Sequence, residues 1–131
     1  MAQSPWGEFA ILVAGKLYRV NANSKQLAFA SEQDDLTDVI YAPDSDLLIG
    51  CDYTTLYVFA PQGLKWKSER VSWDGIELVD VKESTVSGFV LDLFNDVEGE
   101  IMAPAQKVPF LLFLDELHFE SEIDGSWFNA D

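Results

Sequence analysis

One stretch of the chain decides the fold: Asp38-Val-Ile-Tyr-Ala-Pro-Asp44-Ser-Asp-Leu-Leu-Ile-Gly-Cys-Asp-Tyr-Thr-Thr-Leu-Tyr-Val-Phe59. It contains three short runs rich in Val, Ile, Leu, Tyr and Phe, separated by turns made of Pro, Asp, Ser and Thr. Runs of this length and composition are typical of β-strands, and the polar clusters between them are typical of tight turns. We therefore predict an antiparallel meander of strands in this region.

The same pattern extends over the rest of the chain. From Thr85 to Leu93, for example, alternate residues would face opposite sides of a sheet, as in a half-buried strand. Eleven strands are predicted in all: Glu8–Val13, Lys16–Val20, Gln26–Ala30, Asp38–Tyr41, Asp46–Cys51, Thr55–Phe59, Leu64–Glu69, Ile76–Lys82, Thr85–Leu93, Val108–Leu114 and Leu117–Glu120. A short helix within Ser31–Asp38 or within Glu120–Asn129 stays open as an alternative, because helices this short are marginal on propensity alone.

An internal repeat is visible in the sequence. The pair Leu17-Tyr18 recurs 39 residues later as Leu56-Tyr57, and each pair is followed by a turn and a second apolar strand. A third copy fits loosely at Leu112-Phe113, with an insertion of roughly 17 residues that we place within Asn95–Lys107. A period of about 40 residues is the length of one four-stranded propeller blade.

Two segments of the repeat resemble known propeller families. Residues 38–69 resemble the middle of a WD-repeat blade, in which a strand leads into an aromatic-x-Pro-Asp turn, here Tyr41-Ala-Pro-Asp44. The continuation, Leu56-Tyr-Val-Phe-Ala-Pro-Gln-Gly-Leu-Lys-Trp66, resembles the repeat of bacterial quinone-binding propellers. The Trp-Asp dipeptide of the first family is absent, since Phe59-Ala60 stands in its place. The resemblance implies a blade-like meander and no particular activity, because propellers serve as scaffolds for many functions.

Three units are too few for a closed propeller, which has about four to eight blades. We therefore predict an all-β fold: an antiparallel meander of ten to eleven short strands in blade-like repeats. It would be open, or barrel- or sandwich-like, rather than a closed propeller. A chain of 131 residues is long enough to bury a core as one domain, 1–131, with blade-like units at 8–40, 41–80 and 81–125.

The charge is strongly acidic and unevenly distributed. The chain has 23 acids and 8 bases, a net charge of −15 at pH 7. Residues 1–82 carry twelve acids and seven bases, whereas residues 83–131 carry eleven acids and a single base, Lys107. A negative field repels nucleic acid and anionic membranes and attracts basic partners, so we expect neither nucleic acid nor a membrane as a partner. Solubility alone is the alternative explanation of the acidity.

The sequence indicates a cytoplasmic protein. No apolar run approaches the roughly 20 residues of a membrane span, and the first residues lack the basic and apolar regions of a signal peptide. The single cysteine, Cys51, leaves no partner for a disulfide within the chain.

The candidates for catalysis are few. His118 is the only histidine and lies beside Asp115 and Glu116, but no nucleophile motif accompanies it, so a surface histidine is the favoured interpretation. Cys51 ends an apolar run without a basic neighbour, and we expect it to act as a small buried hydrophobic residue. We predict no catalytic residues and no cofactor, since phosphate-binding glycine loops are absent as well.

A metal site is not predicted either. One cysteine and one histidine cannot build a zinc site. The nearest approaches to a calcium loop, Asp44-Ser-Asp46 and Asp92–Glu100, do not follow the EF-hand spacing.

One segment, Lys65-Trp-Lys-Ser-Glu-Arg70-Val-Ser-Trp73-Asp-Gly, is rich in binding-type residues. It holds three of the eight bases and two of the four tryptophans within nine positions. Trp and Arg are enriched in binding hot spots; the alternative is a Trp66 packed in the core, with lysines that protect an edge strand. With the acids that follow it, the segment gives a candidate partner surface: Trp66, Arg70, Trp73, Asp74, Asp115, Glu116, Glu120 and Glu122.

Four functions remain open. The preferred hypothesis is a non-enzymatic acidic binding module of bacterial type, inhibitor- or immunity-like, whose partner is a basic protein. The first alternative is a DNA mimic. The second is a carbohydrate-binding protein or carboxylate-based hydrolase in which Trp66 or Trp73 stacks on a sugar ring. The third is a homo-oligomer that associates through its edge strands.

Overall fold

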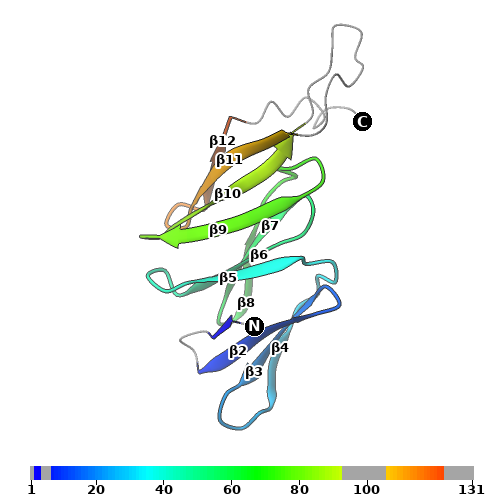
Figure 1. Ribbon diagram of the computed structural model, residues 1–131. Coiled ribbons are helices and arrows are strands. Elements are labelled where there is room, and N and C mark those ends of the chain that lie inside the picture. The colour runs from blue at the N-terminus through cyan, green and yellow to red at the C-terminus, as the bar shows by residue number, and fades with distance from the viewer. Residues whose placement is uncertain (1, 4–6, 93–105, 123–131) are drawn as a thin grey trace, which may run out of the picture.

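The computed structural model describes residues 2–3, 7–92 and 106–122 of the chain. These residues form twelve β-strands and no helix, arranged as three four-stranded antiparallel sheets (Figure 1). The prediction of an all-β antiparallel meander is therefore confirmed. Residues 31–37 are not helical, and Glu120 and Ser121 belong to a strand, while the tail from residue 123 onwards lies outside the described residues.

The strands follow one another in chain order within each sheet. Sheet A contains β1 (Ala2–Gln3), β2 (Glu8–Val13), β3 (Lys16–Asn21) and β4 (Leu27–Ala30). Sheet B contains β5 (Asp38–Ala42), β6 (Leu47–Cys51), β7 (Leu56–Ala60) and β8 (Gly63–Lys67). Sheet C contains β9 (Ile76–Lys82), β10 (Thr85–Asp92), β11 (Gln106–Phe113) and β12 (His118–Ser121).

All eleven predicted strands are present, and the sequence missed only the two-residue strand β1, which pairs with β2. The third copy of the repeat is not equivalent to the first two. Leu17 and Leu56 lie at or next to the start of their strands, whereas Leu112 is the second-last residue of β11. The expected insertion lies within Asn95–Lys107. Its last two residues belong to β11, and its residues up to 105 lie outside the described residues.

The three sheets are stacked face to face, with sheet B between sheets A and C (Figure 1). The first strands of the sheets are neighbours, since β5 contacts both β1 and β9. The larger core lies between sheets B and C and includes Ile49, Leu56 and Val58 from B and Val86, Val90, Phe110 and Leu112 from C. The smaller core lies between A and B and consists of Ala10, Leu17, Leu36, Leu48, Tyr57 and Phe59.

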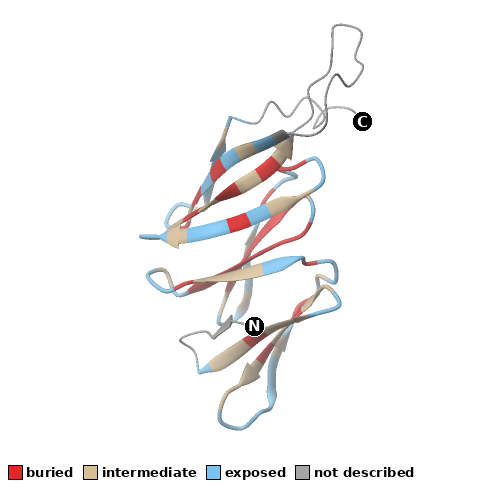
Figure 2. Ribbon diagram, in the orientation of Figure 1, coloured by how far each residue is buried: buried red, intermediate tan, exposed pale blue. Residues whose placement is uncertain are grey.

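Among the residues that the structure describes, the stack is open at both ends. Sheet B is buried on both faces, so that every residue of β6 and four of the five residues of β7 are buried, as the red segments of Figure 2 show. Sheets A and C each pack one face on sheet B, and neither core cluster covers their other face. We call these uncovered faces the outer face of sheet A and the outer face of sheet C.

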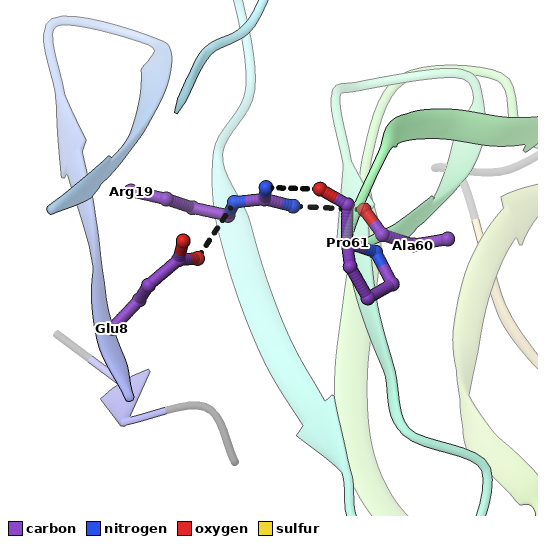
Figure 3. Close-up of polar contacts among 4 residues, drawn as sticks. All are labelled: Glu8, Arg19, Ala60 and Pro61. Atoms are coloured by element: carbon purple, nitrogen blue, oxygen red, sulfur yellow. Dashed lines mark hydrogen bonds and ion pairs between the residues drawn. The ribbon is translucent and has the colours of Figure 1, made fainter. Parts of the chain in front are cut away.

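A buried ion pair joins sheet A to sheet B (Figure 3). Arg19 on β3 is only 3% exposed, and its Nε lies 3.0 Å from Oε1 of Glu8 on β2. Its Nη1 and Nη2 donate hydrogen bonds to the carbonyls of Ala60 and Pro61, at 2.8 Å and 2.5 Å, in the turn after β7. Burial lowers the pKa of Arg19 from its ordinary value and the carboxylate of Glu8 opposes this effect. The guanidinium therefore fastens the first sheet to the second.

Candidate functional site

Strand β12 lies at the outer edge of sheet C and carries one of the predicted acidic residues, Glu120, and a second, Glu122, follows directly after it. It pairs with β11 only, in a register that places Glu120 opposite Leu111 and His118 opposite Phe113. Cross-strand partners point to the same face of a sheet. Leu112 and Phe110, the alternate residues of β11, belong to the core with sheet B. Glu120 and Leu111 therefore lie on the outer face of sheet C.

An apolar hollow of about 510 Å³ lies on this outer face. Val79, Phe89, Pro109, Phe110 and Leu111 form its apolar lining, and Glu120 and Ser121 of β12 and Glu122 after it border the hollow. Val79 on β9 and Leu111 on β11 are 51% and 41% exposed, a large fraction for two aliphatic residues on one sheet. The arrangement is an apolar centre with carboxylates along one side.

Gly88 on β10 makes this arrangement possible. A Cβ at Gly88 would lie 2.0 Å from the carbonyl oxygen of Glu77 and 2.7 Å from the ring of Phe110. Only glycine therefore allows β9 to approach β10 this closely, at the place where the register shifts between Ser87 and Gly88. The ring of Phe110 occupies the space under the hollow.

A second hollow, of about 350 Å³, lies on the other side of β12. Its lining comes from two segments that are distant in the sequence: Glu69, Arg70 and Val71 after β8, and His118, Phe119, Glu120 and Ser121 on β12. The structure thus brings Arg70 and Glu120, two of the residues of the candidate partner surface, to one hollow. Nε2 of His118 lies 3.7 Å from a carboxylate oxygen of Glu120, and both side chains are more than half exposed.

The other predicted surface residues lie outside the two hollows. Trp73 contacts Arg70: the guanidinium of Arg70 lies 5.3 Å from the centre of the Trp73 ring and donates a hydrogen bond to the Trp73 carbonyl at 2.8 Å. Asp74 is exposed beside this pair. Trp66 on β8 is half-buried and packs against the core between sheets B and C. Asp115 and Glu116 are exposed in the turn between β11 and β12.

Sequence analysis missed the apolar centre of the site. Val79, Phe89, Pro109 and Leu111 carry no charge or motif, and each was assigned only to a strand. A signal was present in the run Val108–Leu114, which is apolar at every position and so offers two apolar faces. One of these faces packs on sheet B, and the other is the outer face of the stack.

The two groups considered for catalysis lie in different surroundings, Cys51 in the core between sheets B and C and His118 exposed on β12. Cys51 is fully buried, and burial raises the pKa of its thiol to about 11, so the thiol is protonated at neutral pH. Within the described part of the chain, no cluster of three or more His, Cys, Asp or Glu side chains could hold a metal ion. Nor does that part contain a helix with the length and apolarity needed to cross a membrane.

The apolar hollow, its acidic border and the adjoining hollow beside Arg70 together form a concave surface with apolar and charged lining. Comparison with known proteins assigns no family to this arrangement: no family model, no curated protein and no solved structure matches the chain.

Proposed function

We propose that this chain is a non-enzymatic protein-binding module that binds a basic, partly apolar partner on the outer face of sheet C. The observation that carries the proposal is the apolar hollow of about 510 Å³ bordered by Glu120 and Glu122. Exposed apolar patches with a polar rim are typical of protein interaction sites. The apolar centre would supply affinity, and the carboxylates would supply steering and specificity.

The charge around this face supports a basic partner. The described segments of sheet C, 76–92 and 106–122, contain eight acids and two bases. One of the bases, Lys107, is already paired with Glu77 at 2.9 Å. A partner that carries lysines or arginines would be attracted to this end of the molecule and oriented by it.

The alternatives fit this face less well. A DNA mimic would carry carboxylates across its surface, whereas the centre of this face consists of Val79, Phe89 and Leu111. A sugar site would place a tryptophan ring beside two acids, but among the described residues neither hollow along β12 is lined by a tryptophan, and the guanidinium of Arg70 lies over the ring of Trp73. A cytoplasmic setting suits the proposal because Cys51 is a free thiol.

The proposal is tested with a synthetic peptide of about seven residues in which lysine alternates with valine. In ¹⁵N NMR titrations of the full chain, we expect the largest shifts at the amides of β11 and β12. Binding should weaken as salt rises from about 50 to 300 mM, because exposed charge pairs are screened over about 10 Å at 0.1 M. A peptide with glutamate in place of lysine should not bind.

A matched pair of variants separates a specific site from general acidity. The double variant Glu120→Lys/Glu122→Lys should weaken binding about tenfold, which corresponds to about 1.4 kcal/mol for two rim charges. The control, Asp115→Lys/Glu116→Lys, makes the same change of charge in the turn outside both hollows. Equal losses in the two variants would show that the peptide responds to net charge alone, and the site would then be wrong.

A further inference from the structure

We infer that the outer face of sheet C also binds a second copy of this chain, through the outer face of that copy's sheet A. The two copies would pair head to tail, and their six sheets would close into one ring. The inference rests on the proposed function only in using the same outer face of sheet C, so that pairing and partner binding compete for this face, and its test below separates the two.

The outer face of sheet A is apolar as well. Ala10 and Leu17 point into the core between sheets A and B, so the alternate residues of β2 and β3 point outward. The strand register places them side by side as Phe9 with Val20, Ile11 with Tyr18, and Val13 with Lys16. Val13 at one end of this face and Leu27, which pairs with Val20 at the other end, are 54% and 60% exposed. Within the described part of the chain, both ends of the stack thus present an apolar sheet face that no other element covers.

The two outer faces have opposite charge. In residues 7–31 the only acid is Glu8, which is paired with the buried Arg19. Lys16 lies on the outer face of sheet A, and the Lys25 ammonium lies 5.8 Å from the centre of the Phe9 ring. The described strands of sheet A therefore carry more bases than acids in a chain with a net charge of −15, and the acids Glu32, Asp34 and Asp35 follow in the segment after β4. The outer face of sheet C is bordered by Glu120 and Glu122. Each face is complementary to the other and not to itself.

The repeat points to the same pairing. Tyr18 on β3 corresponds to Tyr57 on β7, which is 5% exposed and packs in the core between sheets A and B. Sheet B therefore uses its Tyr57 face to contact the sheet before it. The equivalent face of sheet A carries Tyr18, and no sheet precedes it among the described residues. The outer face of sheet C is the one that a following sheet would cover, so a second copy would repeat the contact made twice within the chain.

Closure follows from the number of sheets. A head-to-tail contact forms a ring when the rotation between units closes, and a filament when it does not. Two copies contribute six sheets, which is within the range of about four to eight blades found in closed propellers. Each pair of copies would then contain two identical contacts between sheet A and sheet C.

The test is the mass in solution, measured by sedimentation and light scattering on the full chain and on two variants. Leu27→Asp places a charge on the outer face of sheet A, and Leu111→Asp places one on the outer face of sheet C. Both positions are exposed, so the variants should keep the far-UV spectrum and urea midpoint of a folded monomer. We expect the unchanged chain to have the mass of two copies and each variant alone to have the mass of one.

Mixing the variants tests the head-to-tail arrangement. The intact sheet A face of Leu111→Asp can bind the intact sheet C face of Leu27→Asp, so the mixture should regain a pair, about tenfold or more weaker than the unchanged one because one of the two contacts is lost. A mixture that stays monomeric overturns the inference, since a contact between like faces would not be restored. A monomeric unchanged chain, or one that grows beyond two copies, also overturns the two-copy ring.

Charge exchange gives a second test. Lys16→Glu/Lys25→Glu and Glu120→Lys/Glu122→Lys should each weaken pairing, and their combination in one chain should restore it. Failure of this inference is distinguishable from failure of the proposed function, because Leu27→Asp leaves the sheet C face intact. If Leu27→Asp binds the lysine peptide while the unchanged chain is monomeric, only the self-pairing is wrong. If Leu27→Asp does not bind the peptide, the proposed function is wrong as well.

Discussion

Replacing Arg19 with methionine should weaken the attachment of sheet A to sheet B. Methionine keeps the unbranched side chain as far as the position of Nε, but it has no atom in place of the guanidinium carbon, which lies 4.6 Å from the centre of the Phe29 ring. The variant therefore removes this ring contact, the ion pair with Glu8 and the two hydrogen bonds to the carbonyls of Ala60 and Pro61. It removes all contacts of the guanidinium and keeps the aliphatic part of the side chain.

The magnitude follows from the burial of each partner. Removing one member of a buried ion pair destabilises a protein by about 3–5 kcal/mol, because the remaining charge is left buried without its partner. The Glu8 side chain is still 13% exposed, and the carbonyls of Ala60 and Pro61 lie in a surface turn where water can replace the guanidinium. We therefore expect Arg19→Met to lower the free energy of unfolding by about 3 kcal/mol, the lower end of that range.

Two measurements check this expectation. Urea unfolding followed by far-UV circular dichroism gives the loss of stability, and amide hydrogen exchange shows where it falls. Exchange should become faster in β2, β3 and β4 than in β6 and β7, because Arg19 fastens sheet A and lies outside the larger core. The double variant Glu8→Gln/Arg19→Met should recover about 1 kcal/mol or more, since it removes the stranded carboxylate.

Two results would refute this reasoning. The first is an Arg19→Met variant within about 0.5 kcal/mol of the unchanged chain, the range of ordinary surface substitutions. The second is faster exchange spread evenly over sheets A, B and C. Either result would mean that apolar packing between sheets A and B holds them together without the ion pair.

Two further substitutions test the interior. Gly88→Ala should destabilise the protein by about 3 kcal/mol or more, because its Cβ would collide with the Glu77 carbonyl and the Phe110 ring; thermal unfolding should show no such loss for the neighbouring Ser87→Ala. Because burial raises the Cys51 pKa to about 11, the native thiol should resist iodoacetamide at pH 8 and react in urea. The unfolded chain loses that proton first, so stability should fall by about 2–3 kcal/mol between pH 9 and 11; an equal fall in Cys51→Ala would assign it to other groups.

The strands could be predicted from the sequence because their signals are local. Apolar runs bounded by Gly, Pro, Asp and Ser identified every strand from β2 to β12 within two residues at each end. Strand β1 has only two residues, Ala2 and Gln3, and exists through pairing with Ala10 and Phe9 of β2. No local pattern could have revealed it, since its residues gain strand geometry only from that partner.

The repeat was harder to follow, because similar letters need not occupy similar places in a sheet. Leu112-Phe113 matches Leu17-Tyr18 in chemistry, but Leu112 stands near the end of β11 and points back toward sheet B. Leu17 stands near the start of β3 and points forward toward sheet B. Equivalence is decided by pairing across the sheet, which is a non-local property.

The candidate site was predictable in its acids and not in its apolar centre. Glu120 and Glu122 are exposed, as residues of their charge usually are. Leu111 and Val79 belong to strands that also supply the core, and only the stacking order of the sheets determines that their side remains uncovered. A sequence pattern can indicate that a strand has two apolar faces, but it does not indicate which face lacks a neighbour.

The distribution of charge along the stack bears on whether the acidity serves solubility alone. Solubility requires only a net charge, which any arrangement of 23 acids and 8 bases would supply. In this molecule the bases of residues 7–31 outnumber the single acid at one end, and carboxylates border the exposed apolar face at the other. Acids beside an apolar face discourage contact with another acidic surface and favour a basic one, which is a requirement of specificity. The binding proposal therefore accounts for where the acids lie, which solubility does not. Exchanging the charges of Glu120 and Glu122 with those of Lys16 and Lys25 keeps the net charge constant, so this change separates specificity from solubility.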